Sequence, residues 1–352
     1  MLVFVATSCS AGARNEAVLV ERPAAGVGQM PLEKHATPIR PSQSVPTKPP
    51  KSRPFVVAVL SDMNSSYGSL DYHPEVAQSV RWLCDVVQPD LVLGTGDMVA
   101  GMKEGLDYPA MWASFHAVVT DPLNACGLRF APSPGNHDAA RAVRFQGERD
   151  EYVRQWTDRK PDVRFLDDQS WPLRYAFQPD VRANAPRFVS LDLTTPRKLS
   201  SDDLAWLDSV LEQPGGPAIV YGHVPIVPIA HGREDESSND VALAQTLVKH
   251  GVALFLHGHH HAYYPHKAGG VPTISMPNLG SGARAWIGTR DIGGPGLVLL
   301  TIDGTQVSWQ AYHAPTFSQW DVSELPLMLP TDGGDVELWQ PPITKTPTQT
   351  VP

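Results

Sequence analysis

Short apolar runs alternate with stretches of helical periodicity through the middle of the chain. Phe55–Leu60 and Ala218–Tyr221 are apolar runs with β-branched residues, which is typical of buried strands. Between such runs, apolar residues recur every three or four positions, which predicts helices. Because strands that alternate with helices form layered domains, we expect an α/β fold. The predicted strands are 55–60, 91–93, 129–131, 188–191, 218–221 and 252–256, the predicted helices are 73–87, 108–119, 201–211 and 240–250, and residues 263–313 contain strand-like runs only.

Proline separates this block from two flanking segments. Of the 34 prolines, 15 lie in residues 21–54 and 315–352. Proline fixes a backbone dihedral and lacks an amide donor, so packed helix and sheet are not expected there. We therefore divide the chain into an N-terminus (1–20), a Pro-rich disordered tether (21–54), one domain (55–314) and a Pro-rich C-terminal tail (315–352), of which Trp320–Leu329 can still pack on the domain.

The first residues resemble the end of a bacterial lipoprotein signal. An apolar stretch after Met1 ends in small residues around Cys9. By that resemblance Cys9 carries the lipid, the tether is a spacer from a membrane, and the protein is exported, either to the periplasm or to the outer membrane. No basic residue precedes the apolar stretch, so a cytoplasmic protein with an apolar N-terminus is the alternative.

Composition and charge narrow the classes of function. Hydrophobic residues make up 42% of the chain, which is enough for a core. With 28 Lys and Arg against 37 Asp and Glu, the net charge is -9. This balance disfavours a nucleic-acid groove, but a small anionic substrate stays open because a metal ion can supply local positive charge. Cys84 and Cys126 either pair, as in exported proteins, or are two buried thiols.

Polar residues cluster directly after five of the predicted strands. Open α/β sheets bind ligands beyond the carboxyl ends of their strands, so we expect these clusters to meet. Most contain glycine, which lets the chain turn sharply. The clusters are Asp62 with Asn64, Gly96-Asp97, Gly135-Asn136-His137-Asp138, Gly222-His223 and Gly258-His259-His260-His261.

The residue types in these clusters predict a metal centre. Carboxylate, imidazole and amide donors suit first-row divalent or trivalent metals, and their number exceeds what one tetrahedral ion needs. Two ions about 3.5 to 4 Å apart can activate a hydroxide and stabilise a phosphoryl group during its displacement. We therefore expect two ions, which can be manganese, iron or zinc.

The ordered set of clusters resembles the calcineurin-like metallophosphoesterase superfamily, whose motifs are D-x-H, G-D, G-N-H-D/E, a lone His and G-H-x-H. The resemblance implies a single catalytic domain folded as a four-layer α/β/β/α sandwich. It implies that Asp97 bridges both metals and that His137 contacts the substrate phosphate and protonates the leaving oxygen. The other implied ligands are Asp62 and His261 for the first metal, and Asn136, His223 and His259 for the second.

The chain departs from the family pattern at two positions. Asn64 stands where the family usually has a histidine, and an amide oxygen is a weaker ligand. The purple acid phosphatase branch also lacks that histidine and uses a tyrosine, so Tyr67 is a candidate metal or substrate residue. Ala100 stands where many relatives have an acidic residue that orients the catalytic histidine.

The resemblance implies hydrolysis of a small phosphorylated substrate by a metal-bound hydroxide, with a phosphomonoester preferred by analogy with the purple acid phosphatases. The alternative within the family is a phosphodiesterase or nucleotidase. A second alternative is a catalytically weak lipoprotein that uses the fold as a binding module. Arg284, in a glycine-rich loop, either meets the substrate or is solvated, and Arg233–Glu236 is interpreted as a solvated loop.

Overall fold

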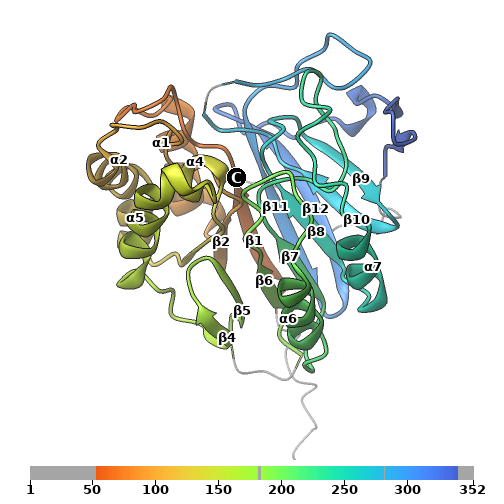
Figure 1. Ribbon diagram of the computed structural model, residues 1–352, viewed down its shortest axis with the longest axis horizontal. Helices are drawn as coiled ribbons and strands as arrows, with labels where there is room; N and C mark the ends of the chain where they lie inside the picture. Colours follow the sequence, from red (N-terminus) through yellow and green to blue (C-terminus); the bar gives the residue numbers. More distant parts are fainter. Residues whose placement is uncertain (1–52, 181–183, 281, 340–352) are drawn as a thin grey trace, which may run out of the picture. The chain divides into compact units, whose positions relative to one another are not determined.

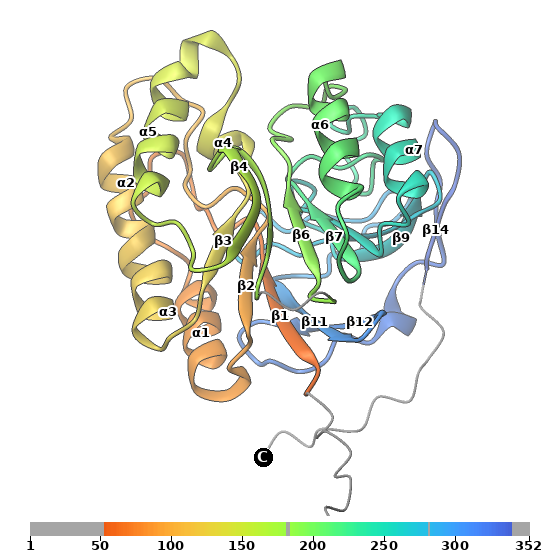
Figure 2. The ribbon, with the colours of Figure 1, turned by 90° about the horizontal axis from the view of Figure 1, so that it is seen from below.

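Two β-sheets lie face to face in the computed structural model, which describes residues 53–180, 184–280 and 282–339 (Figure 1). Helices cover the outer face of each sheet, so the layers run helix, sheet, sheet, helix (Figure 2). The four-layer α/β/β/α sandwich is thereby confirmed. None of the helices in these three ranges is both long enough and apolar enough to cross a membrane.

The first sheet has five strands in the order β12-β11-β1-β2-β3. Three parallel strands carry the first three polar clusters, and two antiparallel strands complete the edge. The strands are β1 (Phe55–Leu60), β2 (Leu91–Gly94), β3 (Phe130–Pro132), β11 (Gly296–Asp303) and β12 (Gln306–His313), and the helical layer consists of α1 (Pro74–Trp82), a π-helical turn (Leu83–Val87), α2 (Tyr108–Phe115), a second π-helical turn (His116–Thr120), α3 (Asp121–Ala125) and α5 (Gln146–Thr157).

The second sheet has seven strands in the order β4-β5-β6-β7-β8-β10-β9. Its parallel strands β6, β7 and β8 are covered by the two remaining long helices. The strands are β4 (Arg164–Ser170), β5 (Arg174–Gln178), β6 (Arg187–Ser190), β7 (Ala218–Tyr221), β8 (Leu254–His257), β9 (Tyr264–Ala268) and β10 (Val271–Ser275), and the helices are α6 (Ser201–Leu211) and α7 (Val241–Lys249).

Strand β1 shows why these runs are apolar throughout. Successive side chains of a strand point to opposite faces. Val57 and Val59 pack between the two sheets, whereas Ala58 and Leu60 pack against the first helical layer. Both faces of β1 are therefore buried, and burying one valine stabilises the fold by about 1.5 to 3 kcal/mol.

The six predicted strands and four predicted helices are confirmed, with ends that differ by a few residues. The pattern of residues 140–187 led to no prediction, and α5 and the β4–β5 hairpin form there. Strand β4 lies at the edge of its sheet and is only half-buried, so it lacks a continuous apolar run. Helix α5 is largely polar and buries only a few side chains.

The chain after β12 stays packed on the domain as far as residue 339. Trp320 is only 4% exposed and stacks on His313. Strand β13 (Met328–Leu329) pairs with β14 (Val336–Glu337), and the Trp339 amide donates to the Pro265 carbonyl. Cys9, most of the tether and the end of the tail lie outside the described residues.

Cys84 and Cys126 form a disulfide, with their Cα atoms 5.8 Å apart. Cys84 lies in the π-helical turn after α1, and Cys126 directly follows α3. Of the two alternatives left open by the sequence, the structure has the paired one. The bond joins two neighbouring parts of the first helical layer.

Candidate metal centre

The polar clusters meet at the carboxyl ends of the parallel strands of both sheets. Backbone hydrogen bonds hold the loop after β1 against the loop after β2. The Asp62 amide donates to the Gly96 carbonyl (3.0 Å), and the Asn64 amide donates to the Asp97 carbonyl (3.1 Å). Adjacent strand ends therefore bring these acidic side chains together.

The first group of side chains surrounds Asp62. Ligand atoms of Asp62, Asp97 and His261 all lie within 4.8 Å of one another. The Asp62 carboxylate is 3.0 Å from Nε2 of His261 and accepts the His259 amide. Asn64 is buried, and its Nδ2 donates to the Val99 carbonyl (3.3 Å), which anchors the amide beside this group.

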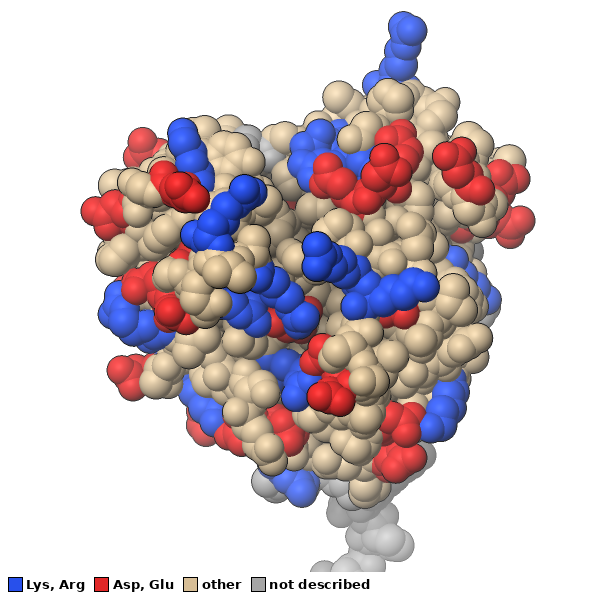
Figure 3. Space-filling model, viewed as in Figure 1, with Lys and Arg blue, Asp and Glu red and all other residues tan. Residues whose placement is uncertain are grey.

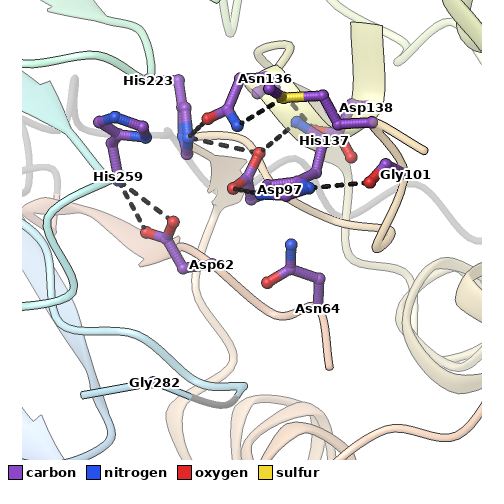
Figure 4. Close-up of polar contacts among 12 residues, drawn as sticks. Asp62, Asn64, Asp97, Gly101, Asn136, His137, Asp138, His223, His259 and Gly282 are labelled. Atoms are coloured by element: carbon purple, nitrogen blue, oxygen red, sulfur yellow. Dashed lines mark hydrogen bonds and ion pairs between the residues drawn. The ribbon is translucent and has the colours of Figure 1, made fainter. Parts of the chain in front are cut away.

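The second group of side chains surrounds His223. Its Nε2 is 2.9 Å from Oδ1 of Asn136 and 3.3 Å from Oδ1 of Asp97. Its Nδ1 is 2.9 Å from the Thr95 carbonyl, so Nδ1 carries the proton and Nε2 can act as a ligand. The His259 ring centroid is 5.1 Å from that of His223. Figure 4 shows Asp97 placed between the two groups.

His137 lies next to Asp97, and its ring is oriented by a backbone carbonyl. Its amide donates to Oδ1 of Asp97 (2.9 Å), and its Nδ1 is 3.0 Å from the Gly101 carbonyl. Its Nε2 is 3.9 Å from Oδ2 of Asp97. Ala100 has no carboxylate that could orient the His137 ring. The Gly101 carbonyl makes the orienting contact instead. Tyr67, which is 56% exposed, lies beside the ring with the centroids 5.2 Å apart.

The Asp138 side chain stabilises the surrounding loops and does not orient His137. Its carboxylate accepts the amides of Met98 (2.8 Å), Val99 (3.0 Å) and Gly135 (2.9 Å). A Cβ atom on Gly135 would collide with Asp97, so only glycine permits this approach of the two clusters.

The electrostatics of the site favour bound cations. Burial alone would raise the pKa of Asp62 and Asp97, but neighbouring histidines outweigh it and hold both below the usual range. Burial lowers the pKa of His223, but the charge of Asp97 exceeds this effect and raises it to about 9. Within the described ranges, the ion pairs of both carboxylates are with histidines only. Two buried carboxylates without a Lys or Arg partner, among nitrogen and oxygen donors, fit two metal ions.

The interpretation of Arg233–Glu236 as a solvated loop is wrong at Glu236. Its Oε2 is 3.0 Å from Nε2 of His259, and it also forms an ion pair with Arg233. Burial lowers the pKa of His259 to about 4, and the hydrogen bond from His259 lowers the pKa of Glu236 to about 2. The ring is therefore neutral and the carboxylate ionised. No motif marks Glu236 in the sequence, because a long loop separates it from the Gly222-His223 cluster.

Arg284 lies behind His261. Its amide donates to the His261 carbonyl (3.3 Å), and its side chain is half-buried. The His261 Nδ1 is 2.9 Å from the Gly282 carbonyl, so its Nε2 faces Asp62. All seven predicted ligands and His137 thus come together, with Tyr67 and Arg284 at the margin.

Comparison with known proteins places this arrangement in a family. The family model of the calcineurin-like phosphoesterases matches residues 55–263, which is more than half of the chain. The anchor protein GAP50 of the Plasmodium inner membrane complex shares 13% identity at a TM-score of 0.54, over 76% of this chain and 87% of that chain. A dimetal phosphatase from Danio rerio shares 16% identity at a TM-score of 0.48, over 73% of this chain and 99% of that chain.

At 13% identity, the likeness to GAP50 shows similarity of fold alone, and no curated protein matches the sequence. The family assignment rests on the match over residues 55–263, which begins at β1 and ends just after the last histidine cluster. The chain therefore belongs to the calcineurin-like phosphoesterase family.

Proposed function

We propose that the protein hydrolyses small phosphomonoesters with the help of two metal ions. The observation that carries the proposal is the convergence of the predicted ligands on Asp97. Asp62, His261 and Asn64 would hold one ion, and the second would be held by the ligands around His223. Asp97 lies between the two groups and would contact both ions.

When bound, the two ions supply positive charge that activates water and stabilises charge on the phosphoryl group. The residues of the chain orient the other participants. The Gly101 carbonyl accepts Nδ1–H of His137, which leaves Nε2 directed toward Asp97. When protonated, Nε2 can give its proton to the leaving oxygen.

Basic residues beside the site favour an anionic substrate. Lys and Arg side chains gather near the middle of the face between α4 (Asn136–Ala139) and α6 (Figure 3). A cavity of about 280 Å³ between these elements is lined by the basic residues Arg141, Arg197 and Lys198, and also by Asp192, which pairs with Arg141 (3.0 Å). A phosphomonoester carries more negative charge than a diester near neutral pH, so it gains more from this surface. This supports the monoester over the diester.

The test measures metal content and turnover together. We expect two ions per chain and faster hydrolysis of an aryl phosphomonoester than of an aryl diester, with manganese, iron or zinc supplied. Asp97→Asn should lose a metal ion and lower kcat/KM at least about a hundredfold. Asp303→Asn is the control, because Asp303 is exposed at the end of β11 and belongs to none of the polar clusters.

Other outcomes of this experiment point to the alternatives. Faster diester hydrolysis would replace the monoesterase with a phosphodiesterase. Two bound ions without turnover on either ester would favour the binding module. The departures from the family pattern at Asn64 and Ala100 are the features that support this alternative. A folded protein without metal would contradict the proposed centre.

We further propose that the protein is exported and anchored through a lipid on Cys9. The disulfide between Cys84 and Cys126 supports this proposal, because such bonds persist mainly in oxidising compartments. In a bacterial host, the full chain should enter the membrane fraction and incorporate labelled fatty acid, and Cys9→Ala should do neither. Recovery of the unlabelled wild-type protein in the cytoplasm would contradict the proposal.

A further inference from the structure

The loop between β7 and α7 folds back on itself and brings an acidic side chain to the metal centre. The Ser238 amide donates to the Pro225 carbonyl (2.8 Å), and the Asn239 amide donates to the Ile226 carbonyl (2.9 Å). These bonds close the loop on its own stem, just after His223. Glu236 thereby reaches His259, whose Nε2 is buried 3.0 Å from the Glu236 carboxylate.

We propose that Glu236 is a positioning residue for the second metal ion. Its Oε2 lies 3.0 Å from Nε2 of His259, where it can hold the Nε2 proton, and this leaves Nδ1 as the ring nitrogen that can bind the metal. This inference rests on the metal centre of the proposed function but not on the reaction that the centre catalyses.

The other two ligand histidines of these clusters show the same division of roles. In His223 one ring nitrogen contacts the Thr95 carbonyl and the other faces Asn136 and Asp97. In His261 one contacts the Gly282 carbonyl and the other faces Asp62. Each ring is therefore held by an acceptor on the side away from its ligand partners, and Glu236 supplies that acceptor for His259.

Glu236 differs from the two carbonyl acceptors in its charge. An ionised acceptor raises the basicity of the ring more than a neutral one, and a more basic imidazole binds a metal more tightly. The ion pair with Arg233 holds the carboxylate in place, so the contacts run from Arg233 through Glu236 to His259. Both positions include an amide, Asn64 in the first and Asn136 in the second. Among the described residues, the histidine of the first position is oriented by the neutral Gly282 carbonyl, whereas His259 of the second position faces an ionised carboxylate.

The experiment measures stepwise binding of Zn²⁺ to the metal-free protein by competition with a chelator of known affinity. Glu236→Gln keeps the shape of the side chain and removes its charge. We expect it to weaken one of the two binding steps by about 10- to 100-fold and to leave the other step unchanged. Glu234→Gln is the matched control, because Glu234 belongs to the same loop but pairs with the exposed His231 (3.3 Å) and should bind both ions like the wild type.

A second comparison separates positioning from direct coordination. If Glu236 acts through His259, Glu236→Gln should have no further effect on Zn²⁺ affinity in a His259→Ala background. Further loss in that background would overturn the positioning role and make Glu236 a ligand itself. Unchanged affinities in the single Glu236→Gln variant would also overturn the inference. Unfolding of the metal-free variant at the wild-type temperature checks that the loop is intact, and a wild-type protein that binds no Zn²⁺ would contradict the centre itself.

Discussion

Gly101 contacts His137 through both of its backbone groups. Its amide donates to the His137 carbonyl (3.1 Å), while its own carbonyl contacts Nδ1 of the ring (3.0 Å). The next residue is fixed as well, because the buried Glu148 carboxylate accepts the amides of Met102 (2.6 Å) and Ala140 (3.3 Å). A Cβ atom on Gly101 would collide with the His137 carbonyl and approach Glu148.

Gly101→Ala should therefore displace His137 without removing a metal ligand. A displacement of about 1 Å at a catalytic group lowers turnover by about a hundredfold. We expect a loss of that order in kcat for the aryl phosphomonoester, with both metal ions retained, as measured by steady-state kinetics and metal analysis. Gly147→Ala is the control, since a Cβ there meets open space within α5. Normal turnover in Gly101→Ala would show that the backbone contact does not position the ring.

The sequence predicted the candidate metal ligands but not the residues that orient them. Candidate ligands such as Asp97 and His223 come directly after strands and beside glycine. Their residue type and their spacing from the strands identify them in the sequence. The contact of His137 with Gly101 uses a backbone carbonyl, which every residue has, so no side chain signals it. Glu236 reaches the site only because a long loop folds back on itself. The sequence of that loop has no periodic pattern that would predict this fold.

At the scale of single elements, the disulfide joins the π-helical turn after α1 to the end of α3. It closes a loop whose ends are 42 residues apart in sequence, which restricts the unfolded chain. Its location is the helical layer, and neither cysteine belongs to a polar cluster.

Cys84→Ala with Cys126→Ala should lower the free energy of unfolding by about 2 to 4 kcal/mol. Metal content and turnover at 25 °C should not change, because the bond does not contact the site. Chemical denaturation with and without a reducing agent measures the effect, and the double variant should no longer respond to the reductant. Equal stability of the oxidised and reduced wild-type protein would argue against the bond.

At the scale of the whole molecule, the segment after β12 forms part of the domain core. Trp320 packs with Tyr263 and stacks on His313, in the core between the sheets. The proline pattern indicates where regular structure is sparse, but it does not tell whether a chain without regular structure is packed. The sequence also does not show that β1 pairs with β11, because their pairing depends on contacts between distant parts of the chain.

Trp320→Ala should destabilise the protein by about 3 to 5 kcal/mol, which is the usual cost of removing a buried aromatic side chain. Leu327→Ala in the same segment should change stability by less than about 0.5 kcal/mol, since Leu327 is 82% exposed. Thermal unfolding distinguishes the two variants. Similar small effects of both would mean that the segment contributes little to the domain.

The two sheets each supply part of the ligand set. Asp62 and Asp97 follow strands of the first sheet, whereas His223, His259 and His261 follow strands of the second. Asp62 and His259 are in contact although 197 residues separate them in sequence. A folding intermediate with only one sheet formed could not hold both halves of the proposed centre, so its ions would enter after the sheets have met. The metal bound in such a centre would then depend on the supply at the place where folding is completed as well as on the ligand types.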